Sequence, residues 1–352
     1  MIEQLNDLYG RLRTAARTSS LFMLSNDTII GARLSIHTLT PESSKEYSMG
    51  KHRGRILLAV DGSDQAFEAV RYVSQLFPPK RMEVVLFHAL SKVPEGFWDV
   101  EKSPEFKHKL SSVAAWAMQE ETVIQESMER ARQLFLDRGV PEDKVSVKVE
   151  ERKKDIAKKI IAESQRGYDA VVVGRLGKSQ LKDLVWGSVA NKLIGRLTDI
   201  PVCVVGGSPQ IGKILVAMDS SEEATKGLHF AGTMMDITDC EVTLLHVIRG
   251  LESWTADASE ELQKAERAAK ILLEDAIDRL ERAGLNRDLI STKILSGATS
   301  RAGAIVEEAR NSGCGTIVVG RRGLSRVEEF FMGRVSKKVL QLAKWSAVWV
   351  VS

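Results

Sequence analysis

Two sets of glycines in the chain have a spacing that could hold an anion. The pattern Gly-x2-Gly-x9-Gly occurs twice, each time directly after a short β-branched run: at Gly174, Gly177 and Gly187, and again at Gly320, Gly323 and Gly333. Glycine lets backbone N–H groups approach an anion closely, and a helix that begins after the last glycine adds the positive end of its dipole. A single copy could consist of ordinary turn glycines, but two copies in matching contexts favour a backbone cradle for phosphate.

An aspartate follows the first apolar run of each half of the chain. Asp61 comes after Ile56–Val60, and Asp219 comes after Ile214–Met218. A carboxylate in such a position can accept hydrogen bonds from a base or a ribose. The alternative is a helix N-terminal aspartate that is stabilised by the helix dipole, and the two roles are compatible.

The elements that would position these residues alternate regularly through most of the chain. Short apolar runs typical of buried strands are followed by segments with helical periodicity. The order recurs in the second half: Gly320 lies 146 residues after Gly174, and Asp219 lies 158 residues after Asp61. We therefore predict an internal duplication in which the first copy is 12 residues longer, mainly in the region of Lys92–Lys109.

Strands that alternate with helices indicate an α/β fold with parallel sheets and right-handed crossovers. We predict two tandem doubly wound domains, each a five-stranded parallel sheet in the order 3-2-1-4-5 with helices on both faces. In an open sheet of this kind, ligands bind at the carboxyl ends of the strands where the strand order reverses. Asp61 would then face Gly174 across one crevice, and Asp219 would face Gly320 across another.

The predicted boundaries divide the chain into four parts. Residues 1–54 form an N-terminal extension of unknown role, 55–206 the first domain, 207–212 a linker and 213–352 the second domain. Leucines at helical spacing in the extension predict a short amphipathic helix that packs on a partner or on the body of the protein. A helix that lies on a membrane surface is the alternative, and a hairpin is predicted after it, around residues 25–27.

Composition limits the classes of function. Apolar and charged contents of 43% and 28% are those of a globular protein, and a net charge of +3 with 6% aromatic residues argues against nucleic-acid binding. No apolar run is long enough to cross a membrane, and the N-terminus does not resemble a signal peptide. The three cysteines form no CxxC pair, so we predict reduced thiols and a cytoplasmic location.

Several catalytic motifs are missing from the sequence. It contains no G-x-G-x-x-G, and a P-loop is incomplete because Val172 stands where its first glycine should be. No Ser/His/Asp order, HExxH or G-x-S-x-G pattern is present. His88 and His246 recur at equivalent strand ends, where they are either bases beside a ligand or, more commonly, buried and hydrogen-bonded histidines. The sequence predicts no catalytic residue and no metal ligand.

Both halves resemble the universal stress protein domain, and the chain resembles a tandem member of that family from Arg55 to its C-terminus. ATP-binding members carry Gly-x2-Gly-x9-Gly-Ser/Thr after the fourth strand and an aspartate after the first. The resemblance implies ATP as the cofactor, with or without Mg²⁺, and a first site made of Asp61, Ala89, Gly174, Gly177, Gly187, Ser188 and Val189. It implies that Asp61 contacts adenine or ribose and that the glycine amides and Ser188 hold phosphates. Ala89 replaces a valine that is frequent at the adenine.

The second site that the resemblance implies consists of Asp219, Val247, Gly320, Gly323, Gly333, Arg334 and Val335. Arg334 departs from the family's Ser/Thr: its guanidinium could pair with a phosphate, or its bulk could displace one. Arg175 and Arg321 each follow the first glycine of a loop. We expect them either to reach an anion or to point to solvent.

The family typically dimerises through its last strand. The resemblance therefore implies that Pro201–Val205 and Ala347–Val351 pair edge to edge, which makes the tandem chain an internal pseudo-dimer. Further self-association stays open. The leading interpretation is a regulatory or sensor protein of the stress response that binds adenine nucleotide. The alternatives are a slow ATPase or phosphotransferase, and a nucleotide-independent interaction module that docks on an unidentified protein partner.

Overall fold

The computed structural model describes residues 54–91, 110–152, 155–177, 187–235, 239–250, 256–323 and 332–352. All of them belong to one compact unit that spans Lys51–Ser352. The N-terminal helix and hairpin that the sequence predicts, and most of the extra segment near Lys92–Lys109, lie outside the described residues.

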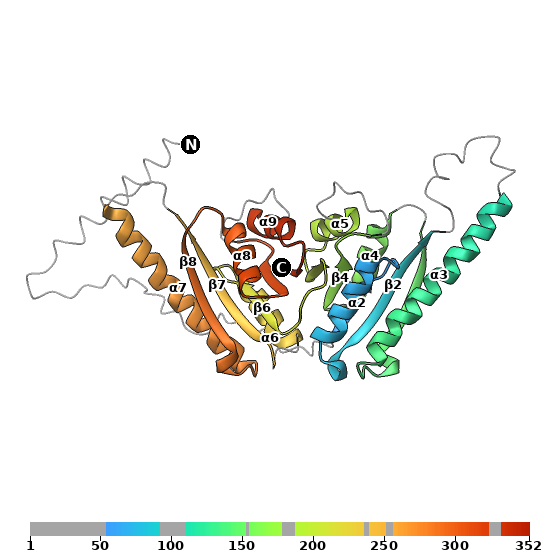
Figure 1. Cartoon of the computed structure of the whole chain (residues 1–352), viewed down its shortest axis with the longest axis horizontal. Helices are drawn as coiled ribbons and strands as arrows, with labels where there is room; N and C mark the ends of the chain where they lie inside the picture. Colours follow the sequence, from blue (N-terminus) through green and yellow to red (C-terminus); the bar gives the residue numbers. More distant parts are fainter. Residues whose placement is uncertain are drawn as a thin grey trace, which may run out of the picture. The chain divides into compact units, whose positions relative to one another are not determined.

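Strands and helices alternate twice in the same order (Figure 1). The first half contains β1 (Arg55–Ala59), α2 (Asp64–Leu76), β2 (Glu83–Ser91), α3 (Leu110–Leu136), β3 (Val145–Arg152), α4 (Ile156–Ser164), β4 (Ala170–Gly174), α5 (Ser188–Arg196) and β5 (Val202–Val205). The second half contains β6 (Lys213–Ala217), α6 (Glu222–Met234), β7 (Glu241–Arg249), α7 (Ala256–Arg282), β8 (Ile290–Ala298), α8 (Arg301–Asn311), β9 (Thr316–Gly320), α9 (Arg334–Leu342) and β10 (Ala347–Val351). Short 3₁₀ turns precede β2, β3 and β8.

The strands form one sheet of ten strands in the order β3-β2-β1-β4-β5-β10-β9-β6-β7-β8. Within each half the pairs are parallel and the order is 3-2-1-4-5, as predicted. The two halves join through β5 and β10, which pair antiparallel from Ala347 opposite Val205 to Val350 opposite Val202. The α/β fold and the predicted internal pseudo-dimer are therefore confirmed.

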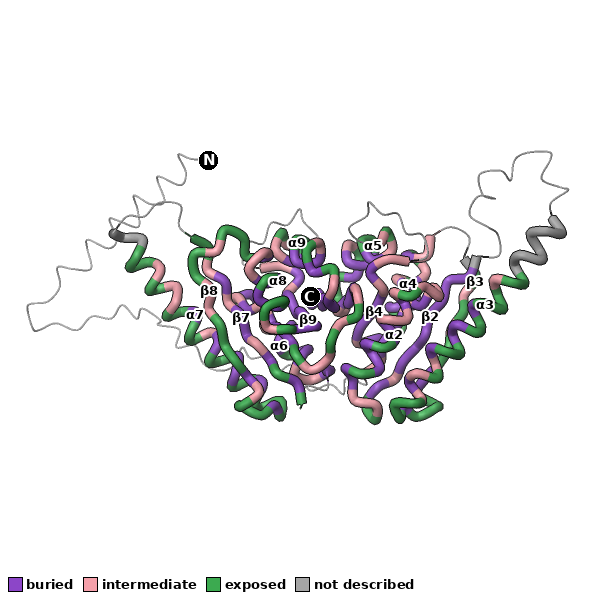
Figure 2. Tube along the Cα trace, in the orientation of Figure 1, coloured by how far each residue is buried: buried purple, intermediate pink, exposed green. Residues whose placement is uncertain are grey.

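Helices cover both faces of the sheet, because successive side chains of a strand point to opposite faces. On one face, α2, α3, α6 and α7 bury apolar side chains in a core that continues across both halves: Val70, Phe135, Leu228 and Leu280. On the other face, α4, α5, α8 and α9 do the same with Ile160, Leu193, Ile305 and Val339. The central strands are buried along almost their whole length, as Figure 2 shows.

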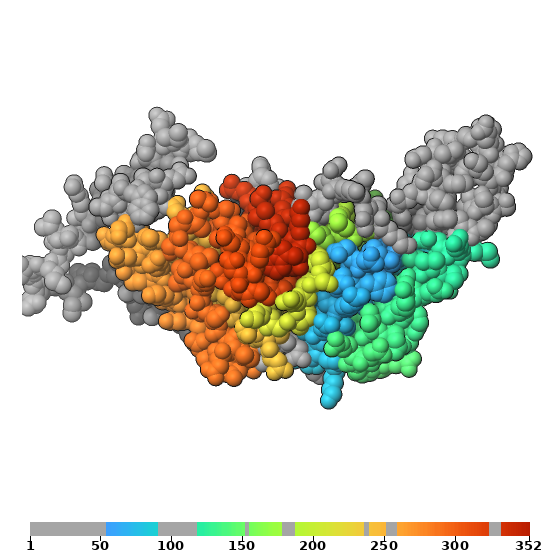
Figure 3. All heavy atoms as spheres, viewed as in Figure 1, coloured from blue at the N-terminus to red at the C-terminus, as the bar shows by residue number. Residues whose placement is uncertain are grey.

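An aromatic cluster fills the junction between the halves. Trp349 on β10 is fully buried, and its indole Nε1 donates a hydrogen bond of 2.8 Å to the hydroxyl of Tyr72 on α2. The Tyr72 hydroxyl also lies 3.0 Å from Oγ1 of Thr316, and burial raises the pKa of Tyr72 well above its ordinary value. The ring of Phe230 is 4.8 Å from that of Trp349, and Phe77 packs edge-on at 5.9 Å. Side chains from both halves thus share one apolar core, and the halves are in direct contact in Figure 3.

The aromatic cluster gives a first prediction. Replacing Trp349 with alanine should lower the free energy of unfolding by about 3–5 kcal/mol, since a large cavity would open at the junction. Trp349→Phe should lose less, because it keeps most of the packing and gives up chiefly the bond to Tyr72. Urea unfolding followed by circular dichroism measures both values. If both variants lost the same free energy of unfolding, the packing of the Trp349 ring at the junction would not be what stabilises the protein.

Candidate functional site

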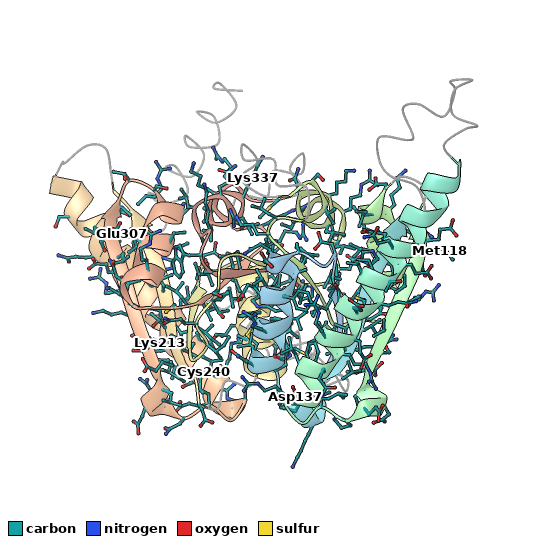
Figure 4. All side chains as sticks on the ribbon, turned by 45° about the vertical axis from the view of Figure 1, so that its right-hand side comes forward. Met118, Asp137, Lys213, Cys240, Glu307 and Lys337 are labelled. Atoms are coloured by element: carbon teal, nitrogen blue, oxygen red, sulfur yellow. The ribbon has the colours of Figure 1, made fainter. Side chains whose placement is uncertain are left out.

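A cavity of about 700 Å³ lies at the carboxyl ends of β6, β7 and β9, beside the N-termini of α8 and α9. Its lining includes every second-half residue that the sequence predicts for the site: Asp219, Val247, Gly320, Gly323, Gly333, Arg334 and Val335. In Figure 4, Lys337 marks α9, at this end of the sheet, while Lys213 and Cys240 mark the opposite end, where β6 and β7 begin. The strand order 3-2-1-4-5 brings these residues together, because β6 lies between β9 and β7.

The aspartate of the cavity is held by the start of the next helix. Oδ1 of Asp219 accepts hydrogen bonds from the backbone N–H of Ser221, at 3.0 Å, and from its hydroxyl. The hydroxyl oxygen of Ser221 accepts in turn from the N–H of Ala224, at 3.2 Å, which makes Ser221 the N-cap of α6. Asp219 is therefore not the helix cap itself. It supports the capping serine and directs Oδ2 toward Gly323.

The first half repeats this arrangement with the same geometry. Asp61 accepts from the N–H and the hydroxyl of Ser63 at 3.0 and 2.6 Å, and Ser63 caps α2. A Cβ atom added to Gly177 would lie 2.6 Å from Oδ2 of Asp61, just as one on Gly323 would lie 2.7 Å from Oδ2 of Asp219. The second glycine of each loop thus touches the aspartate that the sequence paired with it.

Close approach, rather than an unusual backbone angle, explains the glycines of the two loops. None of the six has a positive φ. A Cβ on Gly174 would lie 3.0 Å from backbone atoms of Gln65, and one on Gly320 would lie 2.9 Å from the backbone N of Ala224. Each first glycine therefore lets the end of its strand contact the first turn of α2 or α6.

The third glycine of each loop begins a helix. Gly187 and Gly333 are the N-caps of α5 and α9, and neither helix receives a side-chain cap. The N–H of Gly187 donates to the carbonyl of Arg175 at 2.7 Å, and that of Gly333 to Arg321 at 2.9 Å. These bonds close the loops, and the first N–H groups of each helix lack partners within the helix. Such groups, at the positive end of a helix dipole, can receive an anion.

The first-half residues lie at matching places, although residues 178–186 of the loop are outside the described part. Ser188 is exposed at the start of α5, and Val189 packs against the core beneath it. Ala89 lies on β2 and is 8% exposed. The structure brings Asp61 and Gly177 into contact. The hydrogen bond from the N–H of Gly187 to the carbonyl of Arg175 holds Gly187 at the end of β4.

The expectation for Arg175 and Arg321 is wrong: neither side chain points to solvent or into the cavity. They are 4% and 3% exposed, and each binds carbonyl oxygens at the end of a helix in the other half. Arg175 donates to the carbonyls of Leu340, at 2.7 Å, and Ala343, at 3.3 Å, near the end of α9. Burial lowers the pKa of each guanidinium to about 10, so both stay charged at neutral pH.

Arg321 makes the reciprocal contacts. Its two terminal nitrogens donate to the carbonyls of Ile194 and Leu197 at the end of α5, and its Nε donates to the hydroxyl of Ser352 at 2.6 Å. A positive group at a helix C-terminus satisfies free carbonyls and complements the dipole. The two arginines form a pair of reciprocal helix caps across the junction, hereafter the arginine clasp.

The histidines have the structural role that the sequence analysis favoured. Nδ1 of His88 lies 2.7 Å from the carbonyl of Val60, and Nδ1 of His246 lies 2.8 Å from that of Met218. A carbonyl oxygen only accepts, so Nδ1 carries the proton in each ring. Each histidine ties the end of one strand to its neighbour, and His246 also lines the cavity.

Basic side chains dominate the charged residues that line the cavity. Besides Arg334 it includes four residues that the sequence analysis did not select: Arg249, Arg301, Arg322 and Lys338. Asp219 is the acidic residue of the lining. A residue-by-residue comparison of the two halves at their matched elements would have found the three arginines, whereas Lys338 has a lysine, Lys192, at its matched place. The cavity thus combines glycine backbone, a helix N-terminus and an excess of positive charge, which suits an anionic ligand.

Three further observations concern other chemistry. No helix in the described ranges is both long and apolar enough to cross a membrane. Among the same residues, no group of three His, Cys, Asp or Glu side chains could hold a metal ion. Cys203, Cys240 and Cys314 are buried and form no disulfide bond, and burial raises the pKa of Cys203 and Cys314, the latter to about 11.

Comparison with known proteins supports the tandem arrangement. The family model described as universal stress protein family matches residues 52–206 and again 210–352. The universal stress protein YxiE of Bacillus subtilis is 28% identical over 142 residues, which cover 37% of this chain and 93% of that protein.

Solved structures show the same fold over most of the chain. A universal stress protein from Archaeoglobus fulgidus is 20% identical, with a TM-score of 0.52, and covers 85% of this chain and 98% of its own. One from Pseudomonas aeruginosa is 17% identical, with a TM-score of 0.52 and coverage of 86% and 94%. A universal stress protein in complex with cAMP is 23% identical, covers 40% of this chain and 96% of its own, and has a TM-score of 0.32.

The close approach of the first glycine gives a second prediction. Gly320→Ala should lower the free energy of unfolding by about 1–3 kcal/mol, because the new methyl group meets backbone that cannot move aside. Gly195 on α5 is the matched control: a Cβ there meets nothing within 4 Å, so Gly195→Ala should cause no loss and a gain of up to about 1 kcal/mol. Thermal and urea unfolding measure both. Equal stability of the two variants would contradict the proposed contact with α6.

The arginine clasp gives a third prediction. Arg175→Met should lower the free energy of unfolding by about 2–4 kcal/mol, since it leaves buried carbonyls at the end of α9 without a donor. Arg138, an exposed residue just beyond α3, is the control, and Arg138→Met should change stability by no more than about 0.5 kcal/mol. An Arg175→Met variant as stable as the wild type would show that the clasp does not contribute to stability.

Proposed function

Because the chain belongs to the universal stress protein family, we propose that it binds adenine nucleotide at the carboxyl ends of its strands and acts as a regulatory protein of the stress response. Members of this family bind nucleotides, as the complex with cAMP illustrates. ATP is the proposed ligand of both halves.

The observation that carries the proposal is the cavity of about 700 Å³ in the second half. Ligand pockets in proteins commonly measure about 300–1,000 Å³ and combine apolar walls with a few well-placed polar groups. Here Val247 and Ile305 supply apolar wall, while the glycine loop and the start of α9 supply backbone N–H groups. Asp219 supplies a carboxylate whose Oδ1 is already bonded to Ser221 and whose Oδ2 faces the second glycine of the loop.

Each group has a distinct proposed role toward ATP. Phosphates lie against the N–H groups of the loop and of the first turn of α5 or α9, where the helix dipole favours negative charge. The aspartate accepts hydrogen bonds from the ribose or the adenine. In the second half the guanidinium of Arg334 takes the place of the Ser188 hydroxyl and pairs with a phosphate oxygen. Since Arg334 is exposed at the first position of α9, its side chain has room to move as the ligand enters.

We propose a regulatory protein rather than a rapid enzyme because the polar groups of the cavity already serve the fold. His246 holds the end of β6, and Asp219 supports the capping serine of α6. Nε2 of His246 and Oδ2 of Asp219 can still accept a proton, so formation of ADP by the pure protein is the measurement that separates a binder from an enzyme.

Calorimetric titration of the full chain with ATP tests the proposal. We expect up to two ATP per chain, and Asp219→Ala should weaken one of the two sites by about tenfold or more, since a hydrogen bond to the ligand is lost. Asp278, which is exposed on α7, provides the control: Asp278→Ala removes the same charge and should leave both affinities unchanged. The double variant Asp61→Ala and Asp219→Ala should weaken both sites.

Two results would contradict the proposal. The first is the absence of binding heat with ATP under conditions where the chain is folded. The second is rapid formation of ADP by pure protein that disappears in Asp219→Ala, which would make the chain an enzyme instead of a regulatory binder.

A further inference from the structure

The two halves differ in charge at the positions that surround the ligand. Four arginines of the second cavity have uncharged counterparts at the same places in the matched elements of the first half. The last residue of β7 is Arg249 and that of β2 is Ser91, and the first residue of α8 is Arg301 where α4 begins with Ile156. In the glycine loops, Arg322 of the second half has Leu176 as its counterpart in the first. At the helix starts, Arg334 has Ser188 as its counterpart. The second cavity therefore has four arginines where the first half has uncharged residues, while the first half has Lys154 at the place of the lining residue Thr299.

The arginines form two groups on either side of Asp219. Arg322 follows β9 and Arg334 begins α9, so this pair lies at the glycine loop. Arg249 ends β7 and Arg301 begins α8, so the second pair lies at the opposite side. Asp219 follows β6, which lies between β9 and β7 in the sheet. Neighbouring strands are about 4.8 Å apart, so the ends of β9 and β7 are separated by about two strand spacings, roughly 10 Å.

Arg301 is held at the cavity by a local contact, and part of the Arg322 guanidinium is buried there. Nε of Arg301 donates to the carbonyl of Val247 at 3.3 Å, which holds its planar head beside the end of β7. Nε of Arg322 is buried and has no hydrogen-bond partner among the residues that the structure describes. Asp219 is the acidic residue of the lining, and its single negative charge leaves the four arginines in excess.

We infer that the second-half cavity selects a nucleotide that carries phosphate groups on both sides of its ribose, at the 5′ oxygen and at the 2′ or 3′ oxygen. The 5′ phosphates lie at the glycine loop with Arg322 and Arg334, and the other phosphate pairs with Arg249 and Arg301. Guanidinium groups bind phosphate bidentately, so each pair can hold one phosphate group. This inference rests on the proposed nucleotide binding of the same cavity and adds its selectivity.

The test compares three ligands on the full chain by calorimetry at physiological ionic strength. Adenosine 3′,5′-bisphosphate and ADP have two phosphates each and differ in where the second phosphate is attached. ATP has about the same charge as the bisphosphate, but all its phosphates are attached at the 5′ oxygen. We expect one site per chain to bind the bisphosphate at least about tenfold more tightly than ADP or ATP, because two charge-assisted contacts are gained.

Variants that carry the residues of the first half locate the effect. Arg249→Ser combined with Arg301→Ile should bring the affinities for the bisphosphate and for ADP to within about threefold of each other, because the bisphosphate loses more affinity than ADP does. Arg279→Ser combined with Arg282→Ile removes the same charge from exposed positions near the end of α7, and should keep the preference.

Each outcome has a defined meaning. Equal affinity for ATP and the bisphosphate, or a preference that survives the Arg249 and Arg301 exchange, overturns the inference while nucleotide binding stands. The absence of binding for all three ligands overturns the proposed function as well. A preference that is lost in the cavity variant and kept in the control supports the inference.

Discussion

The antiparallel pairing of β5 with β10 is the interaction on which the rest of the structure depends. Each of these strands would otherwise be an open sheet edge, with unpaired backbone groups and an apolar surface on both faces. Once they pair, Trp349 enters a core shared by α2 and α6, and its indole finds a partner in Tyr72. The same pairing brings the glycine loop of each half within reach of a helix end in the other. One backbone ladder therefore determines both the core and the surroundings of the site.

The arginine clasp connects the two candidate sites through α5 and α9. α9 begins at the cavity of the second half and ends at Arg175, which belongs to the glycine loop of the first half. α5 begins at the site of the first half and ends at Arg321 in the loop of the second. Each helix thus has one end at its own site and the other held by the neighbouring loop. A shift of either helix along its axis would have to break charged hydrogen bonds in the other half.

Local patterns in the sequence were enough to predict the strand order and the aspartate and glycines that line the second cavity, while the family resemblance supplied the edge pairing. They succeed because glycine spacing, strand ends and helix starts are encoded within short segments, and because the chain contains each pattern twice. The role of Arg175 could not be predicted in this way, since its partner Leu340 lies 165 residues away and the contact exists only after the halves have joined. The bond between Tyr72 and Trp349 spans 277 residues and escaped prediction for the same reason. The arginines of the cavity were within reach, because they appear when matched elements of the two halves are compared.

Gly206 and Gly207 follow β5 and pass so close to Lys344 and Trp345 that a Cβ atom on either would meet backbone atoms of the other half. This short tether places the two halves on a single polypeptide, so their association does not depend on protein concentration. It also frees them from exact symmetry. In an assembly of two identical chains every substitution appears twice, at both sites at once. Here Arg334 stands in one half while Ser188 stays in the other, so one polypeptide can carry two different surfaces at matched places in a fixed ratio of one to one.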